Sequence, residues 1–258
     1  MAAEHKETIM RILATDFDNT LFRNREITRE DAEAVARFRS AGNRFGLVTG
    51  RHLASIRDEL ARWDLPLDFV IACTGGILTD GQFHVLSEHR APKAALVPLY
   101  EAAMQLHPQY FCVSVGLERF WFDVGTPPPE GADPQLPAEA LEKLPDYHEM
   151  GTGFFTEDEA AQYTAHFNKT CPELLCAHQN GIHVDVCAPH TGKVSGLYEV
   201  LKLYGAQKDD LFVAGDNLND LSMICEFSSF AMRDGRAELK PHAIATVESI
   251  AEIVKMLL

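Results

Sequence analysis

The sequence of 258 residues contains no hydrophobic run close to the ~20 residues that a membrane-spanning helix requires. Its first residues, Met1 to Thr8, form no apolar segment of the kind found in a secretory signal. No internal repeat is present, and the only biased stretch is 125–137, which holds five prolines. These absences predict a protein with no membrane partner that resides in the cytoplasm, where thiols stay reduced.

The sequence also lacks a run of basic residues, since Arg23-Asn24-Arg25 is the nearest approach to one. Its formal net charge of −15 opposes binding to nucleic acid and to anionic surfaces, so we expect no nucleic-acid partner. The six cysteines form no Cys-x-x-Cys pair, and the cysteines and histidines between 171 and 187 fit no zinc spacing. An acidic chain of this kind binds phosphate only with a metal or with a few well-placed cations.

The most informative stretch runs from Ile12 to Leu21, where an apolar strand leads into Asp16, Asp18 and Thr20. Residues i and i+2 of a strand point to the same side, so the two carboxylates converge beyond its carboxyl end. Open α/β sheets bind ligands at that end. Adjacent carboxylates repel unless a cation or donors lie between them, and hard oxygen ligands suit Mg²⁺. Asp, Asn and Thr are also ordinary turn residues, so this motif alone leaves a simple turn open.

Repeated strand–helix units open and close the chain, which predicts a parallel sheet with helices on both faces. Thr28 begins the first helix in a capping-box pattern and Gly42 ends it. Asp80-Gly81 predicts the tight turn of a hairpin. The expected strands are 9–15, 45–48, 68–72, 211–215, 229–232 and 243–246, and the expected helices are 28–41, one around 53–60, 191–203 and 247–258.

Between these two halves the pattern changes to helices mixed with antiparallel strands. We expect helices at 92–106, 138–144 and 157–169, paired strands at 110–115 and 119–124, and a further strand at 151–156. Asn180-Gly181 predicts a second hairpin, between strands at 174–177 and 182–187. The predicted organisation is an α/β domain formed by 1–82 and 189–258, with an inserted α+β domain at 83–188.

Four separate groups of polar residues fall at predicted strand ends or helix starts. Parallel strands bring their carboxyl ends to one edge, so these groups are expected to meet there. Each group has an ordinary alternative, namely a helix cap, a solvated lysine or a turn, but all four together favour a site. The groups are Asp16, Asp18 and Thr20; Thr49, Gly50 and Arg51; Lys193; and Gly215, Asp216, Asn217, Asn219 and Asp220.

These motifs resemble those of the haloacid dehalogenase superfamily, and in particular its Cof-type branch of phosphatases. That branch also contains sugar phosphatases and phosphomannomutases. The segment from Gly215 to Met223 is a close match to the fourth motif and is the most specific signal. The chain departs from the branch at Asn19, where glycine is common, at Thr74, where Asn-Gly is frequent, and at Val194, which replaces the glycine of Lys-Gly.

The resemblance implies a Rossmann-like core with an inserted α+β cap, and it implies roles for the site residues. Asp16 would be the nucleophile that forms an aspartyl-phosphate, and Asp18 the general acid and base. Mg²⁺ would be held by Asp16, Asp216 and the carbonyl of Asp18, with Asp220 supporting them from behind. The phosphate-binding residues would be Thr49, Gly50, Lys193 and Asn219, and the candidate cap contacts are Arg119, Trp121, Tyr147, His178 and His183.

The function predicted on this basis is a Mg²⁺-dependent phosphatase of small phosphorylated metabolites, with sugar phosphates as the expected substrate class. One alternative is a hexose-phosphate mutase, which would need its phosphoenzyme protected from water. Another is a non-catalytic sensor of phosphometabolites on the same fold. The sequence does not predict an oligomeric state.

Overall fold

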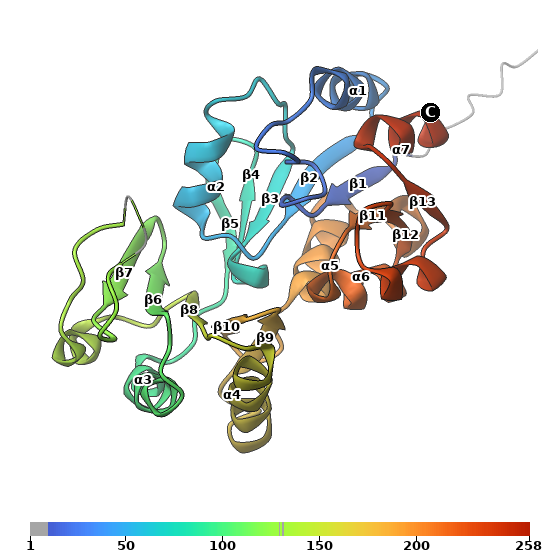
Figure 1. The fold of residues 1–258 in the computed structure, drawn as a ribbon. Helices are drawn as coiled ribbons and strands as arrows, with labels where there is room; N and C mark the ends of the chain where they lie inside the picture. The colour runs from blue at the N-terminus through green and yellow to red at the C-terminus, as the bar shows by residue number, and fades with distance from the viewer. Residues whose placement is uncertain (1–9, 129, 131) are drawn as a thin grey trace, which may run out of the picture.

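The computed structural model describes residues 10–128, 130 and 132–258. Its larger part is an eight-stranded sheet in which the first six strands pair in parallel and the last two pairings are antiparallel (Figure 1). β1 lies in the middle of this sheet, between β11 and β2. In spatial order the strands are β13 (Ala245–Val247), β12 (Ser228–Met232), β11 (Leu211–Gly215), β1 (Ile12–Thr15), β2 (Arg44–Val48), β3 (Phe69–Ala72), β4 (Ile77–Asp80) and β5 (Val85–Glu88).

Helices cover both faces of this sheet, which explains why its central strands, such as β1 and β11, are buried and mostly apolar. On β1, Leu13 belongs to the core under one set of helices, and Ile12 and Ala14 belong to the core under the other. The first set is α1 (Arg29–Ser40), α2 (Leu53–Leu60) and α7 (Ile250–Leu257); the second is α5 (Lys193–Tyr204) and α6 (Leu221–Glu226). The α/β fold expected from the repeated strand–helix units is therefore confirmed.

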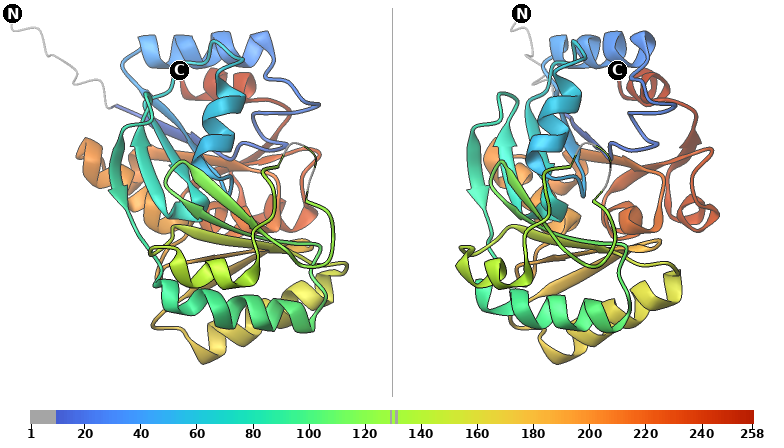
Figure 2. Two further views of the ribbon diagram at one scale, coloured as in Figure 1. Left: turned by 90° about the vertical axis from the view of Figure 1, so that its left-hand side faces the viewer. Right: turned by 60° about the vertical axis from the view of Figure 1, so that its left-hand side comes forward.

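The second sheet is antiparallel throughout and lies between the larger sheet and two helices (Figure 1). Both views in Figure 2 place these helices on its far side. The helices are α3 (Leu96–Gln105) and α4 (Glu157–Thr170), with a 3₁₀ turn at Ala138–Lys143. In spatial order the strands are β7 (Glu118–Phe122), β6 (Tyr110–Val115), β8 (Glu149–Gly153), β10 (His183–Cys187) and β9 (Cys176–Asn180).

Alternation along these strands divides the smaller sheet into two unlike faces. Val184 and Val186 of β10 belong to the hydrophobic core that also contains residues of α3 and α4. His183 and Asp185, on the same strand, point the other way and line a pocket shared with the larger sheet. The open face of the smaller sheet is therefore polar and lies opposite the carboxyl ends of the parallel strands.

Several expected boundaries are wrong in detail. β5 pairs with β4 in the larger sheet, so its residues do not lie in the insert as the division at 83 predicted. Asp80-Gly81 is not a two-residue turn, because β5 begins at Val85 and the Asp80 carboxylate instead accepts hydrogen bonds from the backbone N–H groups of Gln82 and His84. This longer loop places Phe83 against the core.

The second hairpin forms, but its loop is shifted by one residue. Asn180 pairs with His183, so the two loop residues are Gly181 and Ile182, with Gly181 at a φ of +60°. β8 starts at Glu149, two residues earlier than expected. β1 starts at Ile12, so the predicted strand at 9–15 is too long at Met10 and Arg11, while residue 9 lies outside the described residues. Among the helices that the structure describes, none is long and apolar enough to cross a membrane.

Candidate active site

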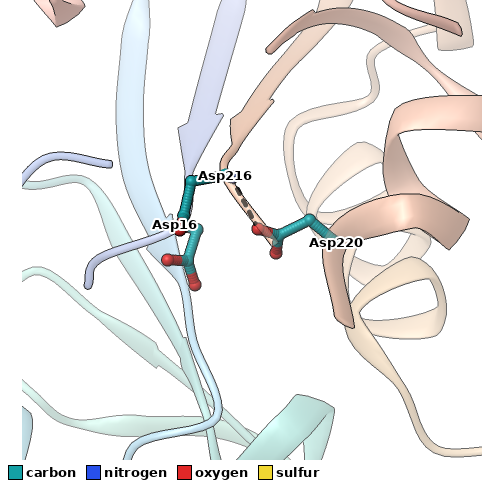
Figure 3. Close-up of side chains that lie close together, drawn as sticks. All are labelled: Asp16, Asp216 and Asp220. Carbon is teal, nitrogen blue, oxygen red and sulfur yellow. Dashed lines mark hydrogen bonds between the residues drawn. The ribbon is translucent and has the colours of Figure 1, made fainter. Parts of the chain in front are cut away.

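Two aspartates follow neighbouring strands at the centre of the larger sheet. Asp16 comes directly after β1, and Asp216 directly after β11, which pairs with β1 in parallel. The Asp16 backbone N–H donates to the carbonyl of Ala214 over 2.8 Å, which fixes the start of this loop. Figure 3 shows the carboxylates of Asp16, Asp216 and Asp220 gathered at this point. One oxygen from each lies within 4.8 Å of the others, so the sequence prediction that they converge is correct.

Lys193 joins two of these acids from the far end of the sequence. Its Nζ donates to Asp16 Oδ1 over 2.6 Å and to Asp220 Oδ1 over 2.5 Å, and the residue is only 3% exposed. Lys193 is the first residue of α5, where the helix dipole disfavours a cation. The two carboxylates offset that cost, so a charged lysine is stabilised at this position only because Asp16 and Asp220 lie next to it.

Burial and mutual repulsion set the protonation of the cluster. Burial raises the pKa of Asp16 to about 8; Asp220 and Asp216 act in the same direction, while Lys193 opposes them. Burial and Asp220 also raise the pKa of Asp216 to about 6. Burial disfavours the charge on Lys193, but Asp16 and Asp220 outweigh it and raise the pKa of its ammonium. The raised pKa values of Asp16 and Asp216 show that one lysine is too little positive charge to stabilise the ionised forms of these acids.

Asp220 is fixed by the loop that it supports. Its Oδ2 accepts hydrogen bonds from the backbone N–H groups of Asp216 (3.0 Å) and Asn217 (3.2 Å), and its Oδ1 is held by Lys193. Gly215 permits this contact, because a Cβ there would lie 2.5 Å from Asp220 Oδ2. Both oxygens of Asp220 are therefore occupied, and the residue acts on the loop rather than on the open pocket.

The remaining oxygens fit a hard divalent cation. Asp16 Oδ1 is bound by Lys193 and Asp216 Oδ1 by the hydroxyl of Thr20 (3.1 Å). No described residue forms a hydrogen bond to Oδ2 of either aspartate. Two carboxylate oxygens that accept no hydrogen bond from the described residues, beside a polar pocket, form the donor set that such cations prefer.

Asp18 is not part of this cluster. Arg51 forms a two-pronged contact with it, from Nε to Oδ2 (2.7 Å) and from Nη2 to Oδ1 (2.6 Å). The Asp18 side chain remains 47% exposed and lines the same pocket as Asp16. The sequence predicted that the Asp16 and Asp18 carboxylates converge; both line one pocket, but the Arg51 guanidinium holds Asp18 outside the cluster of three carboxylates.

The pocket has a volume of about 280 Å³ and is lined by both sheets. Thr49, Gly50 and Asn219, all predicted phosphate contacts, line it with Asp16 and Asp18. Lys193 instead lines an adjoining pocket of about 670 Å³, which also includes Asn219.

Two of the five candidate cap contacts, Arg119 and His183, line the pocket with Asp16. Tyr147 is fully buried in the core of the insert. His178 lines the adjoining pocket, with its Nε2 2.7 Å from the carbonyl of Thr191, and Trp121 lines a separate pocket beside α2. The orientation of each strand decides which of these side chains reach the site.

Four pocket residues were not singled out in the sequence. They are Tyr110, Glu149, Asn180 and Asp185, all on the open face of the smaller sheet. The alternation His-Val-Asp-Val in β10 was the available signal for Asp185, since it places polar residues on one face. Glu149 gave no such signal, because the strand that contains it was predicted to start after it.

Comparisons with known proteins agree with this geometry. A family model for haloacid dehalogenase-like hydrolases matches residues 13–257. The 5-amino-6-(5-phospho-D-ribitylamino)uracil phosphatase YcsE of Bacillus subtilis (strain 168) is 22% identical over 229 residues, covering 88% of this chain and 84% of that protein. A solved subclass IIB sugar phosphatase of the HAD superfamily has a TM-score of 0.80 at 20% identity, covering 96% of this chain and 98% of its own. A haloacid dehalogenase-like hydrolase from B. subtilis has a TM-score of 0.80 at 17% identity, covering 96% and 100%.

Proposed function

We propose that this chain, which belongs to the haloacid dehalogenase-like hydrolases, hydrolyses phosphate esters of small sugars or polyols with Mg²⁺ as its cofactor. The family membership confirms the resemblance drawn from the four sequence motifs. The observation that carries the proposal is the position of Asp16. It is fixed at the end of β1, held by Lys193 through one oxygen, and lies beside Asp18 in one pocket.

Asp16 is the nucleophile in this proposal. Its carboxylate attacks phosphorus, the bond from phosphorus to the ester oxygen breaks, and an aspartyl-phosphate forms. Lys193 favours the carboxylate form that this attack requires. Asp18 gives a proton to the departing oxygen and then takes one from the water that hydrolyses the intermediate. Inorganic phosphate leaves, and Asp16 returns to its starting state.

Asp16, Asp216 and the carbonyl of Asp18 would hold Mg²⁺. Bound there, the cation would offset the charge of the carboxylate nucleophile and of the phosphoryl group in transfer. Asp220 keeps the Asp216 loop in place through its backbone N–H contacts. The Thr49 hydroxyl, the Gly50 backbone, the Asn219 amide and Lys193 would contact phosphate oxygens.

The substrate class rests on the size of the pocket and on the relatives. A pocket of about 280 Å³ suits a small leaving group. The curated relative is named for a phosphate ester of a ribityl chain, and a structural neighbour is a sugar phosphatase. The insert, taken as residues 89–188 because β5 belongs to the larger sheet, would act as a cap that excludes water and selects the leaving group. All six cysteines are free, which supports a cytoplasmic location.

A phosphate-release screen tests the proposal. Sugar, polyol, nucleotide and cofactor phosphates are incubated with the protein and Mg²⁺, and inorganic phosphate is measured. We expect release from a subset of sugar or polyol esters, none from Asp16→Asn, and normal release from Asp158→Asn, which makes the same change at an exposed site on α4. Transfer of phosphate between positions of a hexose without net release would instead identify a mutase. No release and no transfer would reject enzymatic activity on these esters.

A further inference from the structure

The open face of the smaller sheet presents two acids and one arginine to the catalytic pocket. Glu149 on β8 is 2% exposed, Asp185 on β10 is partly buried, and Arg119 lies on β7. All three line the pocket that contains Asp16 and Asp18. Asp185 is also close to the predicted phosphate loop, because a Cβ on Gly50 would lie 3.3 Å from Asp185 Oδ2. A group bonded to phosphate at Asp16 would therefore meet these side chains.

Thr74, in the 3₁₀ turn between β3 and β4, is the hydrogen-bond donor that reaches this acid pair. Its Oγ1 lies 3.2 Å from Glu149 Oε2 and 3.4 Å from Asp185 Oδ2. A hydroxyl has one hydrogen, so it donates to one of the two acids at a time. Thr74 also has a φ of +50°, a conformation that a β-branched residue adopts only at a cost. This contact links the turn that follows β3 to the open face of the smaller sheet.

The polar groups of this cluster have unused hydrogen-bonding capacity. Among the described residues, the buried Nε of Arg119 has no hydrogen-bond partner, and Glu149 accepts one hydrogen bond, from Thr74. Burial, reinforced by Asp185, raises the pKa of Glu149, and burial also raises the pKa of Asp185, which Arg119 opposes. Burying polar groups without a full set of hydrogen-bond partners lowers the stability of the protein. A ligand that supplies those partners gains this free energy on binding.

We propose that Glu149, Asp185 and Arg119 recognise adjacent hydroxyl groups of the leaving group, and so restrict the enzyme to phosphate esters of sugars or polyols. This inference rests on the proposed phosphatase activity and assigns the residues that determine its specificity. Each hydroxyl both donates and accepts, so a pair of adjacent hydroxyls satisfies the two acids and the arginine together.

Other leaving groups satisfy the cluster less well. An ammonium group donates only, so it leaves the Arg119 N–H without an acceptor and adds a like charge next to it. An anionic group is repelled by Glu149 and Asp185. An apolar group leaves Arg119 Nε without an acceptor and brings no donor to Glu149 or Asp185, and buried polar groups left in this way give a strong rejection of a substrate analogue.

The test compares glucose 6-phosphate with its 2-, 3- and 4-deoxy analogues, and p-nitrophenyl phosphate reports the phosphatase chemistry itself. The proteins are the wild type, Glu149→Gln, Asp185→Asn and the control Glu173→Gln, which makes the same change at an exposed position of the insert. Gln and Asn keep the shape of the acids, and thermal unfolding checks the fold of each variant.

We expect wild type and Glu173→Gln to lose about 10- to 100-fold in kcat/KM when the recognised hydroxyl is removed. In Glu149→Gln or Asp185→Asn this ratio should fall to about threefold or less, because a neutral amide forms a weaker hydrogen bond to the hydroxyl than a carboxylate does, so losing that hydroxyl costs less. Equal kcat/KM for parent and all analogues in wild type overturns the inference, and so does an unchanged ratio in both variants.

Glucosamine 6-phosphate carries an ammonium group in place of one hydroxyl, so it tests whether the cluster binds a cation instead of hydroxyl groups. A wild-type preference for it over glucose 6-phosphate that disappears in Glu149→Gln would overturn recognition of hydroxyls. Failure of the proposed function has a different signature, because in that case p-nitrophenyl phosphate and every sugar ester fail to release phosphate. Turnover of p-nitrophenyl phosphate without discrimination among the deoxy analogues rejects only the specificity assignment.

Discussion

Arg51 donates two hydrogen bonds to Asp18, one to each carboxylate oxygen, over 2.7 and 2.6 Å. The guanidinium is itself held over the rings of Phe17 and Phe22, with its Cζ 4.8 and 5.6 Å from their centroids. Phe17 and Phe22, which lie on either side of Asp18 in the sequence, therefore fix the Arg51 guanidinium that orients the Asp18 carboxylate. In the proposed reaction this makes Arg51 a positioning residue for the general acid and base.

The first prediction concerns Arg51→Lys. An ammonium group has no planar fork, so Asp18 loses one of its two directed contacts. We expect kcat for a sugar phosphate to fall about tenfold, because a misplaced acid transfers its proton less effectively. Turnover of p-nitrophenyl phosphate, whose leaving group needs little protonation, should change less than about threefold. An equal loss with both substrates, measured by steady-state kinetics, would show that Arg51 does not act through Asp18.

The second prediction separates Asp16 from Asp18. Asp18→Asn retains the nucleophile, so an aryl phosphate should release a burst of about one phenolate per active site and then stall with phosphate on the protein. A sugar phosphate should give no burst, because its alkoxide requires the proton. Asp16→Asn should give none with either substrate. Mass spectrometry of the quenched Asp18→Asn protein should place the phosphate on Asp16, and phosphate on another residue would reverse the assignment.

The third prediction concerns the cation. A ligand that binds only the folded state at about 100 times its Kd adds about 2.7 kcal/mol, so Mg²⁺ should raise the midpoint of thermal unfolding by about 5–10 °C. Asp216→Asn should abolish this shift, and Asp158→Asn should retain it. Excess chelator should remove activity, and added Mg²⁺ should restore it. A thermal shift of equal size in Asp216→Asn would place the cation elsewhere.

The fourth prediction concerns the pH dependence of stability. Burial raises the pKa of Asp185 from 3.8 to about 6. Below about pH 4 the group is protonated in the folded and unfolded states alike, and above about pH 6 the folded protein bears the full cost of the buried charge. Stability from this group is therefore present at low pH and lost as the pH rises from about 4 to about 6, by about 3 kcal/mol at most.

Asp185→Asn removes this titration. Its free energy of unfolding, measured by urea denaturation, should exceed that of the wild type increasingly as the pH rises from about 4 to 6, and the difference should then level off. Asp158→Asn should show no such trend, since its carboxylate is exposed. A difference between Asp185→Asn and wild type that is constant across this range would mean that the ionised form of Asp185 is well stabilised in the folded protein.

Parts of this fold follow from local sequence. The apolar runs of β1 and β11 predict central parallel strands because both of their faces must be buried. Thr28 predicts the start of α1 because its hydroxyl satisfies the backbone N–H of Asp31, as observed at 3.1 Å. The predicted tight turn at Asp80-Gly81 was wrong, because the hydrogen bonds of the Asp80 carboxylate and the packing of Phe83 against the core favour a longer loop. A local turn preference is overridden where tertiary contacts stabilise a different loop conformation more strongly.

The sequence by itself determined the positions of Asp16 and Asp216, because each follows directly on a buried strand and parallel strands share one edge. Only the tertiary structure decided that Lys193 binds Asp16, and that Glu149 and Asp185 face the same pocket from the second sheet. The physical reason is the range of the interaction. The direction of a residue at a strand end follows from its own backbone, whereas an ion pair between residues 177 positions apart depends on how separate layers pack.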